Sequence, residues 1–313
     1  MKYREIDVSG IRTYPAKDRL SKVSADLAAG PHVKGRSFAE FVGNLPGFLA
    51  AKDIKAVASA VVAAHRNKRP VILGMGAHPI KVGLSPLIID LMRKGVITAF
   101  ASNGASIIHD FEMAFMSCTS EDVAKELGTG DFGMGIETGQ MVNRAITEGV
   151  RKGQGIGRAI GEFISSSDFQ DKDKSIFSEA FRLDLPATVH VAVGSDIIHM
   201  HPEADGAAIG EGSLRDFRLL AAVIADLEGG VYINLGSAVI LPEVFLKALN
   251  VARNLGHKVK DFTTVNMDFI QHYRPGQNVL KRPTMNKGQS FAITGHHEIM
   301  FPLLAAMVIE GLQ

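Results

Sequence analysis

Two residue types that often carry function are nearly missing from this sequence. Its 313 residues include a single cysteine, Cys118, and no tryptophan. One cysteine excludes an internal disulfide framework and a cysteine-based zinc site, and it favours a reducing compartment. Because aromatic residues make up only 7% of the chain, few side chains are left on which nucleic-acid bases could stack.

Strong charge and long apolar runs are missing as well. The formal net charge is +1, which gives no general attraction for nucleic acid or for an anionic membrane. No apolar run approaches the roughly 18 residues typical of a membrane span. The opening MKYREIDVSG lacks the apolar stretch of a secretory signal. We therefore expect a cytoplasmic protein with no nucleic-acid or membrane partner.

The sequence does contain a regular alternation of strand and helix patterns. Short apolar runs bounded by glycine, asparagine or charged residues predict buried strands at 70–75, 96–101, 187–193, 230–235, 262–266 and 290–294. Helical patterns of ten residues or more lie between them, at 79–94, 137–152, 213–227, 242–255 and 298–311. This alternation predicts an α/β protein with a Rossmann-like, doubly wound, mainly parallel six-stranded sheet and helices on both faces.

One long stretch, residues 104–186, breaks this rhythm with mostly helical sequence rich in glycine and serine. We interpret 112–186 as a helical insertion within a single domain that spans 1–313. Its glycine-dense segment GTGDFGMGIETG, at 128–139, fits a mobile lid and an ordinary connection equally well.

Histidines gather in the loops that follow the predicted strands. Six of the eleven histidines lie there: His78, His109, His199, His201, His296 and His297. In open α/β sheets, ligands bind outside the carboxyl ends of the strands, where these loops meet. The sequence therefore predicts a site for a small-molecule substrate at that edge of the sheet.

The first of these loops belongs to the stretch VILGMGAHPIKVG, residues 71–83. An apolar strand pattern ends at Gly74-Met75-Gly76, and a helical pattern follows at once. Small residues before a helix let backbone amides approach a phosphate group, and the helix N-terminus adds favourable partial charge. However, the dinucleotide fingerprint G-x-G-x-x-G fails here, because Pro79 occupies the third glycine position.

Several segments, in the same order along the chain, resemble the deoxyhypusine synthase family. Residues 71–111 resemble the family's first strand–helix–strand unit, with Ser102-Asn103-Gly104-Ala105 at the place of its T-A-G-G loop. ADGAAIGEGSLRDF resembles the family's D-G-S-L-G-D segment, and LGSAVILPE its L-G-G-G-V segment. The end of the chain, from RPGQNVLKRP through HHEIMFPLLAAMVIE, resembles the family's closing segment.

This resemblance implies NAD as the cofactor, bound without the fingerprint. It also implies a homo-oligomer, a tetramer or a dimer. The positions that resemble the family's cofactor contacts are Gly74, Gly76, Ala77, His78, Ser102, Asn103, Gly104, Asp205, Gly236, Ser237, Asn266, Met267, Gly295 and His296.

The residues that perform the family's reaction are not matched in this sequence, although its cofactor loops are. Deoxyhypusine synthases use a lysine in an S-W-G-K segment to carry the transferred group as an imine. That position is Pro283 here, which cannot act as a nucleophile, and Lys281, two residues away, is the candidate substitute nucleophile. We therefore expect a transferase of this group or another NAD-dependent enzyme, but not deoxyhypusine synthesis.

Three interpretations of the histidine-rich edge stay open. In the first, His109 and Asp110 lie near the nicotinamide, His109 transfers a proton near neutral pH, and Asp110 orients the His109 ring. In the second, His199 and His201 bind a divalent metal and support hydrolysis, since two histidines two residues apart on an extended chain can reach one ion. In the third, the protein binds a nucleotide without turnover.

Overall fold

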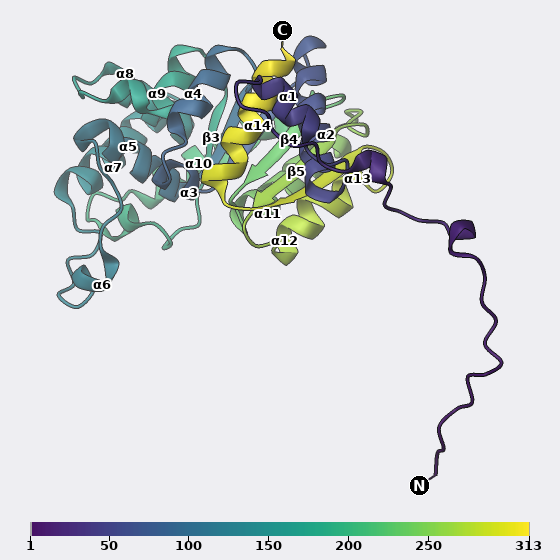
Figure 1. The fold of residues 1–313 in the computed structure, drawn as a ribbon. Helices are drawn as coiled ribbons and strands as arrows, with labels where there is room; N and C mark the ends of the chain where they lie inside the picture. Colours follow the sequence, from purple (N-terminus) through teal and green to yellow (C-terminus); the bar gives the residue numbers. More distant parts are fainter. Residues whose placement is uncertain (1, 313) are drawn as a thin grey trace.

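The computed structural model describes residues 2–312, and its centre is one parallel sheet. The six strands lie in the order β3-β2-β1-β4-β5-β6, and every neighbouring pair is parallel. This confirms the predicted Rossmann-like α/β fold (Figure 1). The strands are β1 (Val71–Met75), β2 (Ala99–Asn103), β3 (Ala187–His190), β4 (Val231–Leu235), β5 (Thr263–Asp268) and β6 (Gln289–Thr294).

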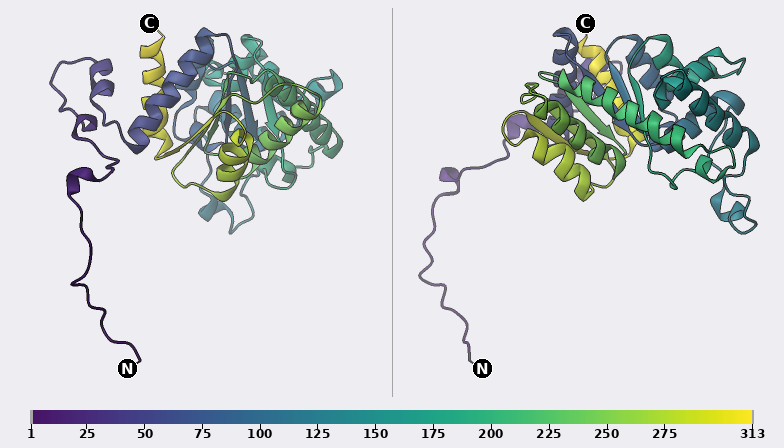
Figure 2. Two further views of the ribbon diagram at one scale, coloured as in Figure 1. Left: turned by 90° about the vertical axis from the view of Figure 1, so that its right-hand side faces the viewer. Right: turned by 180° about the vertical axis from the view of Figure 1, so that it is seen from behind.

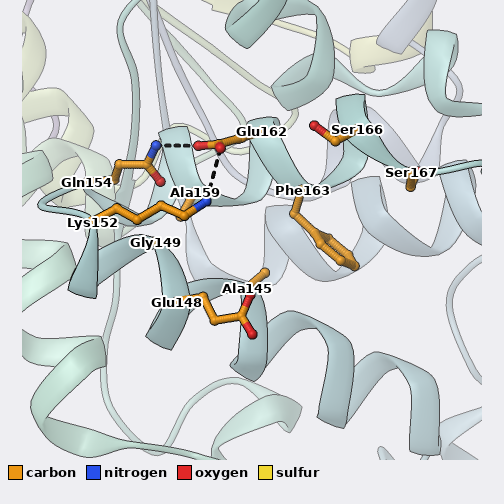
Figure 3. Close-up of a pocket in the computed structure, with 10 residues that line it drawn as sticks. All are labelled: Ala145, Glu148, Gly149, Lys152, Gln154, Ala159, Glu162, Phe163, Ser166 and Ser167. Atoms are coloured by element: carbon orange, nitrogen blue, oxygen red, sulfur yellow. Dashed lines mark hydrogen bonds and ion pairs between the residues drawn. The ribbon is translucent and has the colours of Figure 1, made fainter.

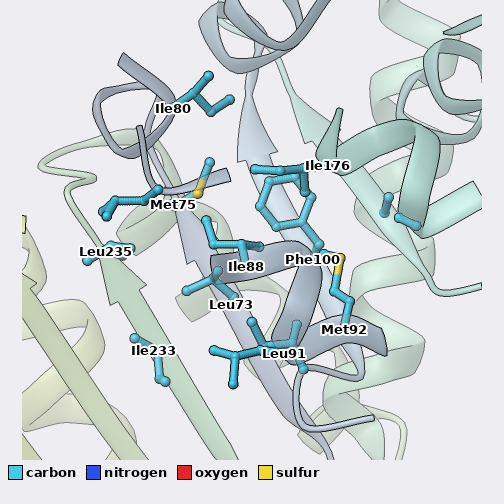
Figure 4. Close-up of a cluster of buried hydrophobic side chains, with 14 of the residues drawn as sticks. Leu73, Met75, Ile80, Ile88, Leu91, Met92, Phe100, Ile176, Ile233 and Leu235 are labelled. Atoms are coloured by element: carbon cyan, nitrogen blue, oxygen red, sulfur yellow. The ribbon is translucent and has the colours of Figure 1, made fainter. Parts of the chain in front are cut away.

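Alternate residues of the strands pack against two helical layers, as the two-residue period of a strand requires. Leu73 and its neighbours on one face contact a first layer, whereas Ile72 and Tyr232 on the other face contact a second. Figure 4 shows part of the first core, where β1, β2 and β4 meet α4. The first layer contains α2 (Leu49–Arg66), α4 (Ser85–Arg93) and α14 (His297–Gly311), and the second contains α10 (Gly206–Ala225) and α11 (Ile240–Asn254).

The predicted strands agree closely with the observed ones, and the differences have local causes. Strand β2 begins three residues later than predicted, because the amides of Val96 and Ile97 both bond back to Leu91 at the end of α4. The predicted helix 79–94 is divided into α3 (His78–Lys81) and α4. Gly83, at φ +79°, makes the left-handed turn that separates them.

Helices α5 to α9 occupy most of the stretch that interrupts the alternation. They group beside β3 at one end of the sheet (Figure 1). The stretch therefore brings helical side chains close to the carboxyl ends of β2 and β3. The helices are α5 (Gly104–Met116), α6 (Val123–Glu126), α7 (Ile136–Arg151), α8 (Ile156–Ser166) and α9 (Ile176–Arg182), and the 3-10 turn η3 (Lys172–Lys174) precedes α9.

The chain between β5 and β6 forms a continuous helical stretch. It consists of α12 (Tyr273–Pro275), the π-helix η5 (Gly276–Lys281) and α13 (Arg282–Thr284). At its far end, the Pro283 carbonyl accepts a hydrogen bond from Arg253, near the C-terminus of α11. Because α11 begins at the carboxyl edge and runs back along the sheet, residues 281–284 lie toward the amino edge.

The N-terminal residues leave the domain as an extended arm (Figures 1 and 2). The arm contains two 3-10 turns, η1 (Ala16–Asp18) and η2 (Ala25–Leu27), and ends at α1 (Phe38–Asn44), which lies beside α14. Among residues 2–312, no helix has both the length and the apolar character needed to cross a bilayer.

Candidate functional site

The chain changes direction between β1 and β4, and two glycines meet there. Crossovers from β1 lead toward β3 and those from β4 lead toward β6, so the β1/β4 boundary is the topological switch point at which such folds bind ligands. A Cβ on Gly76 would lie 2.5 Å from the Gly236 carbonyl oxygen. Gly236 itself has φ +63°. Only glycine fits this approach without displacing backbone.

The ring of His297 packs against this crossing. A Cβ on Gly236 would lie 2.6 Å from Cε1 of the His297 ring. The side chain is almost fully buried, and neither ring nitrogen makes a hydrogen bond of ordinary geometry. Nε2 lies 3.6 Å from the Asp268 carboxylate. We call Gly76, His78, Gly236, Asp268 and His297 the switch site.

The charge state of His297 follows from these surroundings. Burial lowers the pKa of His297 below its usual value, while the Asp268 carboxylate and the backbone of Met267 act in the opposite direction. A neutral imidazole with two unpartnered nitrogens costs about 1–3 kcal/mol per unsatisfied group. His297 therefore keeps a buried donor and a buried acceptor that no group among the described residues satisfies.

Exposed rings lie beside the switch site. The His78 ring lies 5.3 Å from that of His297. Phe269 stacks on His296 with their ring planes 9° apart and their centroids separated by 6.2 Å. Phe269 is 49% exposed, so it presents an apolar face to solvent where a planar ligand could pack.

The polar side chains under the switch site are already hydrogen-bonded to one another. Asn234 donates to the Asn266 side chain at 2.7 Å and to the Ser237 carbonyl at 2.9 Å. Asn266 in turn donates to Gln271. Ser237 accepts from the Leu241 amide at 3.2 Å and so caps α11. This network fixes the loops but leaves Oδ1 of Asn234 without a partner.

Other predicted cofactor residues fall into supporting positions. Gly74 gives room to Tyr232, whose hydroxyl would lie 2.4 Å from a Cβ there. The Met267 side chain is buried in the core. Gly295 donates to the Asp268 carbonyl, and a Cβ on it would meet Met300. Of the predicted set, Gly76, His78 and Gly236 belong to the switch site and His296 borders it, while Ala77 lies between Gly76 and His78 in the chain.

Four more predicted cofactor positions, including Asp205, lie at a helix N-terminus or directly before one. Asn103 accepts from the Ser106 amide and caps α5, and the buried Ser102 hydroxyl lies against the Asn103 carbonyl. Asp205 is exposed and accepts from two amides at the start of α10. A Cβ on Gly104 would lie 2.1 Å from the Asp196 carboxylate. This carboxylate already lies at the N-terminus of α5.

A second part of the site lies one turn of α3 away from His78. It is a pocket of about 170 Å³ that takes residues from the loops after β1, β2 and β3. We call it the His109 pocket. Its polar lining consists of Lys81, His109, Glu112, Ser120, Glu121, Ser195 and Asp196.

A hydrogen-bonded chain fixes the proton of His109. The Thr119 hydroxyl donates to Glu112 at 2.5 Å, so it can only accept from Nδ1 of His109, which lies 2.6 Å away. Thr138 donates to the other Glu112 oxygen. Because the neutral imidazole has one proton, this arrangement leaves the Nε2 lone pair of His109 available.

The surroundings keep His109 neutral. Burial, and to a lesser degree the positive charge of Lys81, lower the pKa of His109 to about 4. At neutral pH the side chain is therefore an unprotonated imidazole with a defined tautomer. That is the state in which histidine accepts a proton.

Asp110 does not orient His109, contrary to the first interpretation. It is fully buried and accepts hydrogen bonds from Ser175 Oγ and from the amides of Ile176 and Phe177. These bonds cap α9. Adjacent residues of a helix point in different directions, and His109 bonds instead to Thr119, which Glu112, one turn further along α5, holds in place. Burial raises the pKa of Asp110 to about 6.

His199 and His201 do not form a metal site. Nδ1 of His199 accepts from the amides of Gly194 and Asp196, which uses the lone pair that would bind an ion and places the proton on Nε2. Nε2 of His201 lies 2.8 Å from the Gly133 carbonyl and must donate to it. Within residues 2–312, no three histidine, cysteine, aspartate or glutamate side chains are grouped to hold a metal.

The glycine-dense segment 128–139 is tied down at its middle. The Gly133 carbonyl accepts from His201, and the Gly133 amide donates to Glu121 at 2.8 Å. The His201 ring packs against Gly139, where a Cβ would lie 2.0 Å from Nδ1. Phe132, in the same segment, lines the His109 pocket. The segment therefore forms a wall of this pocket.

Lys281, the substitute nucleophile considered from the sequence, is not brought to the site. It is exposed and lies in η5, two residues before Pro283 at the amino end of the sheet. Neither the switch site nor the His109 pocket includes it. Its position follows from the direction of the helical stretch between β5 and β6, which runs away from the carboxyl edge.

A further cavity, of about 230 Å³, lies between α7 and α8 (Figure 3). Lys152 and Gln154 both bind Glu162 there, the former at 3.1 Å. The lysine and the glutamate therefore satisfy each other, and the cavity contains no predicted site residue.

Three important side chains were missed in the sequence. Glu112 could have been recognised, because it lies three residues after His109 on one helix, a spacing that brings side chains together. Asp196 and Thr119 carry no such signal, since loops of unpredictable course position them. His297 is among the loop histidines of the sequence, but the family resemblance predicts its neighbour His296 as the cofactor contact.

Comparisons with known proteins identify the fold and no family. No protein-family model matches the sequence, and no curated protein matches it. Among solved structures, a candidate deoxyhypusine synthase from Entamoeba histolytica has a TM-score of 0.54 and 14% identity, with 88% of this chain and 94% of that chain covered. AgrE, solved with ornithine and NAD+, has a TM-score of 0.52 and 15% identity over 82% of this chain.

A conserved candidate LOR/SDH protein from Methanococcus maripaludis has a TM-score of 0.52 and 17% identity, covering 82% of this chain and 69% of that chain. The present chain spans only 32% of AgrE. At these identities the similarity establishes a shared fold. The chain therefore has the Rossmann-like architecture of these proteins, and its own residues must decide its function.

Proposed function

We propose that this protein is an enzyme that binds NAD or a related nucleotide at the switch site and uses His109 as a proton acceptor. The observation that carries the proposal is the crossing of Gly76 over Gly236 above the unpartnered ring of His297. A bound nucleotide needs loops that let its phosphates approach the backbone and side chains whose hydrogen-bonding groups are still unpaired. This crossing has both features.

The residues of the switch site fit a dinucleotide. The amide of His78, at the first position of α3, has no partner within that helix, so the loop after β1 offers a donor toward a phosphate oxygen. His297 offers one donor and one acceptor to a ribose or a carboxamide. Phe269 offers an apolar face to a base. The N-terminus of α5 is less suited to phosphate, because the Asp196 carboxylate lies against it.

The His109 pocket is the proposed place of the substrate. Its volume, about 170 Å³, fits a small molecule, and its lining offers a free imidazole Nε2 and a lysine. NAD, when bound, supplies a hydride acceptor. The chain itself supplies Nε2 of His109 to take a proton from the substrate, and the Thr119–Glu112 pair to hold the imidazole in the correct tautomer.

The resemblance to deoxyhypusine synthases supports the proposed cofactor but not the family's reaction. The solved structures of this fold include AgrE with ornithine and NAD+, which supports a nicotinamide dinucleotide as the ligand of the switch site. The imine chemistry of deoxyhypusine synthases has no lysine here, because Pro283 occupies that position, and this proline is buried near the amino edge. We therefore propose proton transfer by His109 in its place.

Calorimetric titration with NAD tests the binding step. Wild-type protein should bind NAD, and Gly76→Ala should weaken binding at least about tenfold, a loss of about 1.4 kcal/mol, because its methyl group enters the crossing. Phe269→Ala, at an exposed position that folding does not require, should weaken binding by about fivefold. Gly210→Ala is the matched control, since nothing lies within 4 Å of a Cβ there.

Three results would each contradict the proposal. Absence of heat on titrating wild-type protein would favour a protein that keeps the fold without the nucleotide. Equal affinities of the wild-type, Gly76→Ala and Phe269→Ala proteins would show that NAD binds elsewhere. Binding of NAD without any turnover across small-molecule substrates would favour the non-catalytic interpretation.

A further inference from the structure

The N-terminal arm presents apolar side chains that its own domain does not cover. Between residues 2 and 26, seven large apolar side chains are at least 60% exposed. The hydrogen bonds found for this stretch are all local, within the arm. The seven are Tyr3, Ile6, Val8, Ile11, Tyr14, Leu20 and Val23. Such a content of β-branched and aromatic residues is unlike that of a solvated linker.

The base of the arm is fixed to the domain. The Gly30 amide donates to the Asn44 carbonyl, and the Gly47 amide donates to the Leu27 carbonyl, both at 2.9 Å. This pair of bonds holds the arm beside α1, on the same side as α14 (Figure 1). Beyond it, the 25 residues from 2 to 26 could reach up to about 80 Å when extended.

The outer half of the arm has local structure of its own. The Ile11 amide bonds to the Val8 carbonyl across Ser9-Gly10, and the Asp7 carboxylate accepts from the amide and hydroxyl of Ser9. The flanking segments 3–8 and 11–14 are rich in residues that favour extended conformation. The arm is therefore shaped in part before it meets any surface.

A matching apolar groove runs along the second helical layer. Two hollows of about 410 and 420 Å³ lie between α10 and α11 and share Phe217. Apolar side chains line both hollows, and Leu214 and Val239 remain 49% and 45% exposed. Helix α10 has 20 residues, so it is about 30 Å long. An extended segment of about nine residues would cover that length.

The groove and the base of the arm lie on opposite faces of the sheet. Helices α10 and α11 belong to the second layer, whereas α1 lies beside α14 in the first. The arm leaves the domain and points away from it in each view (Figure 2). We propose that the arm of one copy, through residues 3–14, docks in the α10/α11 groove of a second copy of this chain.

Reciprocal docking would give a dimer in which each copy contributes an arm and a groove. A two-fold arrangement closes such an exchange and covers both apolar surfaces. The groove begins next to His190 and Val193, at the carboxyl end of β3. The arm of the second copy would therefore reach the edge of the sheet that carries the proposed substrate pocket.

Sedimentation velocity of the full chain tests the dimer. Wild-type protein and the control Leu183→Asp, at an exposed apolar position outside the groove, should sediment as dimers. Ile11→Asp and Leu214→Asp should each weaken association by at least roughly tenfold. A wild-type monomer at micromolar concentration, or dimers unaffected by both variants, would overturn the proposal.

Cross-linking then distinguishes docking of the arm on a second copy from docking of the arm on its own domain. The exposed Cys118 is first replaced by serine, and two proteins carrying Ile11→Cys and Leu214→Cys, respectively, are mixed and oxidised. Docking between copies predicts a covalent dimer that contains one of each, and Ile11→Cys mixed with Leu183→Cys should give none. A link that forms only within one chain carrying both substitutions, or no link at all, would contradict docking on a second copy.

Discussion

Nδ1 of His109 lies 2.6 Å from the Thr119 hydroxyl, and this contact decides which nitrogen of the imidazole is free. The hydroxyl gives its only proton to Glu112, so His109 must donate from Nδ1 and present the Nε2 lone pair. Thr119→Val should remove this constraint and let the proton move to Nε2. Nitrogen NMR of the histidine rings should show the change of tautomer at His109. The control Thr129→Val, at an exposed threonine, should leave it as in wild type.

Lys81 should hold the pKa of His109 down. Burial is the larger cause of the lowered pKa, about 4, and the charge of Lys81 is the second. Lys81→Met should therefore raise the pKa of His109 without restoring its ordinary value. Proton NMR titration of the ring measures this pKa. Lys94→Met, at another exposed lysine, should not change it, and an unchanged pKa in Lys81→Met would remove the lysine from the account of the pocket.

Acid should destabilise the protein in part through His109. Its pKa is about 4 in the folded state and about 6.5 in the unfolded chain, so the unfolded chain binds more protons between these values. The stabilising contribution of the neutral ring is complete above pH 6.5 and is lost as the pH falls toward 4. His109→Gln should therefore gain stability relative to wild type over this window. Melting temperatures that differ by the same amount at pH 7.5 and at pH 4.5 would contradict this.

The glycine crossing should not tolerate a side chain at either position. Gly236→Ala places a residue at φ +63° and its methyl group against His297, which should cost about 1–3 kcal/mol of the free energy of unfolding. Chemical denaturation measures this loss. Gly206→Ala, at the open first position of α10, should cost nothing measurable. A stable Gly236→Ala protein that still binds NAD would remove the crossing from the site.

Divalent metal should not stabilise this protein. His199 uses its lone pair on two backbone amides, and His201 donates to the Gly133 carbonyl. Metal-stripped protein should therefore melt at the same temperature with and without Zn²⁺ or Mn²⁺. A rise in melting temperature that disappears in His199→Ala would show that the loop rearranges to bind an ion.

The sequence was sufficient to predict the sheet, and it predicts a site at the carboxyl edge of that sheet. Short, nearly continuous apolar runs bounded by turn residues are strong signals of buried strands, and the carboxyl ends of parallel strands necessarily meet at one edge. Sequence spacing could not predict which way a loop side chain points. Asp110 faces the domain and caps α9, and His201 packs against Gly139, because contacts between distant segments determine these directions.

Lys281 and the arm show a second limit of sequence patterns. Lys281 is two residues from the family's lysine position, yet the helical stretch that carries it runs toward the amino edge. The arm has apolar residues that suggest burial, but only the structure shows that its own domain leaves them exposed. A pattern of apolar residues predicts that these side chains will be buried, but it does not identify the surface that buries them.

The most direct test of the central claim is histidine-selective NMR of the full chain during titration with NAD. Binding at the switch site predicts that the His297 and His78 ring signals shift with NAD concentration. The exposed His257, beyond the end of α11, should not respond. Shifts confined to other histidines, or binding measured by calorimetry with no change at His297, would place the nucleotide elsewhere and contradict the account.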